Sequence, residues 1–137
     1  PRVHARDGSA DHGGARLEKL AIDLEAQAAY VDVFSPMPYH ARFGHAADPA
    51  WISRQVSWLG EHLGVKGTAG ERLRIWPIVQ ISDWGEPVPV GQIDEVLRRG
   101  ARAPATGVMV FAWSGLRAHP QKIDAIGQTF RALTTPE

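Results

Sequence analysis

The apolar residues of this chain change their spacing several times, and these changes divide the sequence into helices and strands. Apolar positions three or four residues apart predict amphipathic helices over 15–29 and 90–102. A third is expected over 48–64, opened by an Asp-Pro pair and closed by a glycine, and a fourth begins at the His-Pro pair at 119–120. A proline is tolerated in the first turn of a helix, and a glycine tolerates the left-handed turn that ends one. We therefore expect four helices.

Between these helices lie three runs rich in β-branched and aromatic residues, at 30–35, 73–81 and 107–113. The second and third runs are almost continuously apolar, which is typical of strands covered on both faces. Pro77 has no N–H to donate and weakens the predicted ladder of the second run. Helices that alternate with such strands imply right-handed crossovers and a parallel sheet, so the predicted fold class is α/β.

The spacing of the strands favours one architecture within that class. The predicted strands start about 42 and 34 residues apart, in the range of (β/α)8-barrel units with loop insertions. Three strands do not close a barrel, which typically takes about 250 residues. We therefore expect a partial (β/α)8 (TIM) barrel, with 15–137 as its C-terminal βα units. Residues 1–14 are polar and glycine-rich, and they are expected to form a flexible lead-in.

Composition narrows the classes of function. The 137 residues carry 15 basic and 15 acidic side chains, and a net charge of zero disfavours nucleic acid and anionic lipid as partners. No cysteine is present, which excludes disulfides, thiolate metal sites and a cysteine nucleophile. No apolar run approaches the roughly 18 residues of a membrane span. The sequence predicts a soluble protein that acts on neither membranes nor nucleic acid.

The carboxyl ends of the predicted strands carry the candidate chemistry, because ligands bind there in parallel α/β proteins. Aromatic rings cover the apolar face of a sugar ring, while amide, hydroxyl and carboxylate groups bind its hydroxyls. Residues of both kinds follow these strands, and they predict a carbohydrate site. They are Tyr39, His40, Gln80, Asp83, Trp84, Trp113 and Ser114.

Packing is the competing explanation for the aromatic residues. Tyr39 and Trp113 would then be core residues of the sheet, each capped by a hydrogen bond. For Trp51, Trp58 and Trp76, which fall on helices or in mid-strand, packing is explanation enough.

Hydrolysis of a glycosidic bond usually needs two carboxylates on opposite sides of the bond. Asp83 closely follows a predicted strand end, Glu86 lies three residues further on, and Asp32 starts its strand at the wrong end. Asp83 is therefore the catalytic candidate, and a pair of Asp83 with Glu86 stays open. Capping of its own loop is the competing role for Asp83. The six histidines show no zinc-protease spacing, and motifs for nucleotide binding or serine acyl transfer are absent. We expect neither a metal nor another cofactor.

Three segments resemble the last three βα units of a (β/α)8-barrel glycoside hydrolase. VDVFSPMPYH is similar to the sixth strand, RIWPIVQISDW to the seventh, and GVMVFAWSGL to the eighth, and the resemblance covers roughly 15–134. It implies that Tyr39 orients a carboxylate or sugar hydroxyl, that Trp113 forms the floor of the −1 subsite, and that Gln80 and Asp83 lie at the seventh-strand position. The glutamate nucleophile common in one large clan is absent from that position.

The resemblance carries two further implications. An acid/base residue from the fourth strand would belong to a segment upstream of Pro1. A non-proline cis peptide is also expected at Trp113-Ser114, a feature that such barrels often show.

The leading hypothesis is a carbohydrate-active barrel protein that hydrolyses O-glycosidic bonds when complete, and a secreted or periplasmic location would follow from it. A second hypothesis keeps the sugar site without catalysis, as a carbohydrate-binding or degenerate barrel segment. A third is a small α/β module whose strand-end aromatics anchor a protein partner. In each case the bare sheet edges need a cover, either a missing N-terminal barrel segment or a second copy.

Overall fold

The computed structural model describes residues 22–135. The chain divides into two compact units, 1–31 and 32–137, and each is described by itself. The predicted lead-in at 1–14 and the first part of the first predicted helix lie outside the described residues. In the first unit the described helix is α2, Leu24–Ala28, whose N-cap Asp23 accepts a hydrogen bond from the backbone N–H of Ala26.

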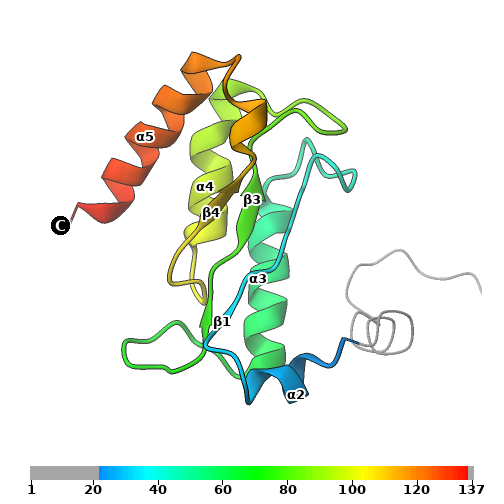
Figure 1. Ribbon diagram of the computed structural model, residues 1–137, viewed down its shortest axis with the longest axis vertical. Helices are drawn as coiled ribbons and strands as arrows, with labels where there is room; N and C mark the ends of the chain where they lie inside the picture. Colours follow the sequence, from blue (N-terminus) through cyan, green and yellow to red (C-terminus); the bar gives the residue numbers. More distant parts are fainter. Residues whose placement is uncertain (1–21, 136–137) are drawn as a thin grey trace, which may run out of the picture. The chain divides into compact units, whose positions relative to one another are not determined.

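The second unit alternates strands with helices, as the sequence predicts (Figure 1). Short 3₁₀ turns, η1 and η2, come before α4 and after β4. The elements in chain order are β1 (Val33–Phe34), α3 (Ala50–Leu63), β2 (Arg74–Ile75), β3 (Ile78–Gln80), η1 (Val90–Gln92), α4 (Ile93–Ala101), β4 (Met109–Phe111), η2 (Trp113–Gly115) and α5 (Pro120–Thr134).

The strands form two small parallel sheets, one of β1 with β2 and one of β3 with β4. Trp76 and Pro77 separate β2 from β3, and Pro77 has no N–H with which to continue a ladder. Backbone bonds nevertheless extend the pairing on both sides of this break. Ile78 N–H donates to the carbonyl of Pro36 at 2.8 Å, and Met109 N–H donates to the carbonyl of Pro77 at 2.9 Å. The segment 74–80 therefore pairs with β1 on one side and β4 on the other.

The helix boundaries follow the local signals in the sequence. Gly64 ends α3 in the left-handed conformation with φ of 69°, and Pro120 occupies the first turn of α5. In the Asp-Pro pair that opens α3, an Asp48 side-chain oxygen was a candidate cap, but the carboxylate forms an ion pair with Arg54 instead. Within residues 22–135, the helices all lack the length and apolar character of a membrane span.

The hydrophobic core lies on one side of the strands. Figure 1 shows α3, α4 and α5 side by side, with α4 in the middle. From the strands, Val79 and Ile81 are buried in this core, and Val108 and Val110 pack against it. The helices contribute Ile52, Ile93, Val96, Leu97, Ile123, Ile126 and Phe130.

The prediction that the last strand is covered on both faces is wrong for the described chain. Side chains alternate along a strand, so Val108 and Val110 face the helices while Met109 and Phe111 point to the other side. Met109 is 37% exposed and Phe111 is 38% exposed. The described part of the chain therefore leaves one face of β4 partly open to solvent.

Candidate functional site

A cluster of aromatic rings lies beyond the carboxyl ends of the strands, and Tyr39 is at its centre. The Tyr39 ring stacks on Phe111 at 5.1 Å between centroids and on Phe43 at 6.4 Å, and meets Trp84 edge-on at 5.7 Å. Trp84 and Phe111 also contact each other, with centroids 5.8 Å apart. Tyr39 itself is buried, but the other three rings are exposed over a substantial part of their surface. The tertiary structure thus brings Tyr39 and Trp84 together, as the sequence predicts.

Phe43 and Phe111 belong to this cluster, and the sequence analysis did not single them out. The signal for Phe111 is present in the sequence, because Met109, Phe111 and Trp113 alternate with smaller residues along one strand. That alternation indicates one face with large side chains that differs from the face packed on helices. For Phe43 no local pattern existed, because it lies in a loop.

Gln80 connects the two loops that carry these rings. Its side-chain Nε2 donates to the carbonyls of Ser82 and Trp84, each at 2.9 Å, and its Oε1 accepts from the backbone N–H of Arg42 at 2.9 Å. The side chain is fully buried. Both ends of the amide are therefore engaged within the protein, and Gln80 positions the loops around the rings.

Asp83 is held by a buried lysine from α5. Oδ1 of Asp83 accepts hydrogen bonds from Lys122 Nζ at 2.8 Å and from the backbone N–H of Val88 at 2.8 Å. Lys122 Nζ also donates to the carbonyl of Ile81 at 3.1 Å. The hydrogen bond from Lys122 keeps the pKa of Asp83 below its usual value, so the carboxylate is ionised at neutral pH.

The bond to Val88 closes the loop that follows β3, which is the capping role considered for Asp83. Lys122 lies in the first turn of α5, and the sequence analysis did not identify it. Its ammonium is buried because Asp83 and the Ile81 carbonyl satisfy it.

His40 is fully buried and points to a partner on η1. Its Nε2 lies 2.9 Å from Oε1 of Gln92, and Gln92 Nε2 donates to the carbonyl of Ala46 at 2.8 Å. This second bond fixes the orientation of the amide, so His40 Nε2 carries the hydrogen and donates it. Burial lowers the pKa of His40, against the opposing effect of the Gln92 hydrogen bond. His40 is therefore a neutral side chain that ties its loop to Gln92, a residue the sequence analysis did not identify.

The predicted residues of the last strand end, Trp113 and Ser114, lie on η2. Trp113 is 65% exposed, and Ser114 is exposed beside it. The expectation of a cis peptide at Trp113-Ser114 is wrong. In the described chain the cis bonds are Ala103-Pro104 and, as the non-proline case, Phe111-Ala112.

Three tryptophans assigned to packing lie apart from the cluster or at its margin. Trp51 stacks on His45 and touches Phe43, with centroids 4.4 Å and 6.3 Å away. Trp58 stacks on His62 within α3. Trp76 donates its indole N–H to the hydroxyl of Thr106 at 3.1 Å.

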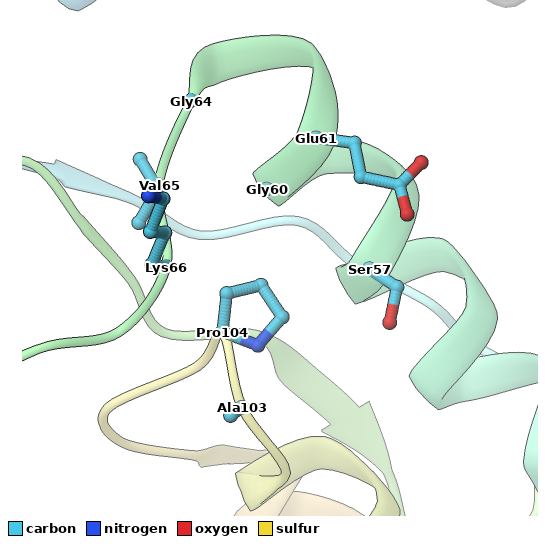
Figure 2. A pocket seen from close by; sticks show the side chains of 8 residues that line it. All are labelled: Ser57, Gly60, Glu61, Gly64, Val65, Lys66, Ala103 and Pro104. Carbon is cyan, nitrogen blue, oxygen red and sulfur yellow. The ribbon is translucent and has the colours of Figure 1, made fainter.

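A pocket of about 540 Å³ lies at the amino ends of the strands. Figure 2 shows it between the last turn of α3 and the ring of Pro104, which faces Gly60. Its walls come from the segments that precede β2 and β4, so it is opposite the strand ends where parallel α/β proteins bind ligands. Packing accounts for the close approach here, because a Cβ at Gly60 would lie only 2.3 Å from Pro104 Cγ.

Comparison of the chain with models of protein families finds no match, and neither curated proteins nor solved structures yield one. Among the residues that the structure describes, no group of three histidine, aspartate or glutamate side chains is arranged to hold a metal ion. Function must therefore be argued from the geometry of the aromatic cluster.

Proposed function

We propose that the carboxyl ends of the strands form a carbohydrate site in a segment of a (β/α)8-barrel glycoside hydrolase. The observation that carries this proposal is the cluster of Trp84, Phe43 and Phe111 around a buried Tyr39. Aromatic faces that are partly exposed next to polar groups suit a sugar ring, which has apolar C–H faces and a polar rim.

The hydroxyl of Tyr39 supports the same proposal. It makes no hydrogen bond to the described part of the chain, and it is not among the fully enclosed polar atoms. Burial raises the pKa of this phenol, so it keeps its proton and can donate to a sugar oxygen. Trp113 and Ser114, both exposed beyond β4, would extend the site along the strand ends.

In the hydrolytic form of the proposal, Asp83 serves as the carboxylate that stays ionised. A lowered pKa suits a nucleophile, a base or an electrostatic stabiliser and does not suit a proton donor. The proton donor and second carboxylate would come from a barrel segment that precedes this chain. The alternative is a site that binds sugar without hydrolysis, which the engagement of Asp83 by Lys122 and Val88 favours.

The proposal also includes a further segment or chain that pairs with the exposed edges of the two sheets. Within the described residues, β1 pairs only with β2 and β4 pairs only with β3. Exposed strand edges invite pairing with another chain. A preceding barrel segment or a second copy of this chain would supply that pairing.

Titration with neutral and acidic oligosaccharides, followed by tryptophan fluorescence and by the melting temperature, tests the sugar site. A ligand at a hundredfold excess over its Kd adds about 2.7 kcal/mol to stability, which raises Tm by several degrees. We expect Trp84→Ala to lose this response and Trp58→Phe, on α3, to keep it. If no member of the panel changes fluorescence or Tm in the unaltered protein, the proposal is wrong.

Release of reducing ends from the same panel separates binding from hydrolysis. Asp83→Asn should abolish release and leave sugar binding in place if Asp83 is catalytic. Because the proton donor would come from the preceding barrel segment, release is measured with that segment present, and binding without release then favours the non-catalytic site. The Tm of each variant is the control for folding, because Asp83 also closes its own loop.

A further inference from the structure

Arg42 places a cation directly on the aromatic cluster. Its guanidinium carbon lies 5.2 Å from the centroid of the Trp84 ring. The side chain is exposed, and no carboxylate in the described part of the chain forms an ion pair with it. Arg54, Arg98 and Arg99, by contrast, each bind an aspartate or glutamate. The donors of the Arg42 guanidinium are therefore available to a ligand that lies against Trp84.

The structure holds Arg42 in this position through its backbone. The Arg42 N–H donates to Gln80 Oε1, which ties it to the end of β3. The loop after β3 passes close by, because Gly85 has φ of 86° and a Cβ there would lie 3.2 Å from the Arg42 Cα. Arg42 and Trp84 are thus fixed against each other by the same glutamine, which also binds the Trp84 carbonyl.

On the loops that follow β1 and β3, Arg42 is a cation without an ion-pair partner in the described part of the chain. Lys122, from α5, is paired with Asp83 of the loop after β3, so its charge is neutralised there. Glu86 is exposed in the loop after β3 and makes no ion pair with Arg42. His40 is buried, and its lowered pKa leaves it neutral at pH 7.

We propose that this site selects acidic sugars, with Arg42 binding the carboxylate of a uronic acid whose ring lies against the exposed rings of the aromatic cluster. This inference rests on the proposed carbohydrate site and names its substrate class. A guanidinium has five donors and no acceptor, and its planar fork matches a carboxylate with two parallel hydrogen bonds. A neutral sugar hydroxyl has a single oxygen and does not accept both of these parallel hydrogen bonds in the same way. Arg42 is thus a specificity-determining residue.

The test compares one oligosaccharide in two charge states, an oligogalacturonate and its full methyl ester, which keeps the ring and removes the charge. Binding is measured by tryptophan fluorescence and calorimetry. We expect the unaltered protein to prefer the acid by about two- to fivefold, the range for an exposed ion pair. Arg42→Gln should remove this preference, so that the acid and the ester bind with the same affinity. The matched control Arg131→Gln, on the last turn of α5, should keep it.

Two outcomes would overturn the inference. Equal binding of acid and ester by the unaltered protein shows that charge is not recognised, although the carbohydrate site itself stands. Full retention of the preference in Arg42→Gln assigns recognition to another residue. If neither form binds, and no other sugar does, the carbohydrate proposal fails first.

Discussion

At the scale of single residues, buried polar side chains decide the arrangement of the site. Gln80 is fully buried and satisfied at both ends of its amide, Lys122 is buried against Asp83, and His40 is buried against Gln92. A buried polar group without a partner costs about 1–3 kcal/mol, so each of these contacts constrains where its loop can lie. The loops beyond the strands are held by these three anchors.

The Asp83–Lys122 pair predicts an asymmetric response to substitution. Asp83→Asn leaves a buried ammonium without its carboxylate and should reduce the free energy of unfolding by about 1–3 kcal/mol. Lys122→Met removes the buried charge and leaves a half-exposed Asp83 still bound to Val88, so it should cost less than about 1 kcal/mol. Urea denaturation at pH 7 measures both.

The pH dependence has a defined sign. The folded pKa of Asp83 lies below its ordinary value of 3.8, so its contribution is complete above about pH 4 and is lost as the pH falls through the lowered pKa. The difference in stability between unaltered protein and Asp83→Asn should therefore shrink in strong acid. If Asp83→Asn and Lys122→Met lose the same free energy of unfolding at pH 7, the asymmetric response predicted for this pair is wrong.

At the scale of elements, the helices follow the sequence prediction closely and the strands do so only in part. The helix boundaries at Gly64 and Pro120 follow from the backbone of these two residues. Glycine tolerates the left-handed turn that ends α3, and proline, which has no N–H, fits the first turn of α5. Strands depend on a neighbour, and Pro77 divides the second predicted strand into β2 and β3. The burial of β4 could not be predicted from its run of apolar residues, because that run does not say which face a helix will cover.

Two glycines in helices predict opposite effects of alanine. Gly100 of α4 packs on the strands so closely that a Cβ would lie 2.7 Å from Val79 Cγ1 and 2.8 Å from Val108 Cγ2. Gly100→Ala should therefore cost about 1–3 kcal/mol by overpacking, despite its better helix propensity. Gly127 of α5 faces only the flexible end of Arg131, and Gly127→Ala should stabilise by about 0.5–1 kcal/mol. Thermal denaturation of the two variants compares them, and stabilisation by both would contradict the packing of α4.

At the scale of the whole molecule, the division of the chain into units 1–31 and 32–137 has a consequence for truncation. The buried core residues of the described chain all lie in the second unit. Tyr30 is 89% exposed and stands just before the boundary between the units. The second unit should therefore keep its fold without the first.

Brief digestion with chymotrypsin tests this expectation. The first cut should follow Tyr30, since exposed positions outside the core are cleaved first. The resulting fragment 31–137 should unfold cooperatively with a Tm close to that of the intact chain, as measured by circular dichroism. Tyr30→Ala is the control and should delay the cut. Loss of the cooperative transition in the fragment would show that the core depends on the first unit.

The sequence alone determined the alternation of helices with short parallel strands in 32–135 and the helix ends at Gly64 and Pro120. Those features depend on neighbouring residues and on the backbone limits of proline and glycine. It also predicted that Tyr39, Gln80 and Trp84 lie near one edge of the strands, because the carboxyl ends of parallel strands lie at the same edge. The partners of these side chains were decided by the tertiary structure. Arg42 meets Gln80 across 38 positions and Asp83 meets Lys122 across 39, and no local pattern records a contact over that separation.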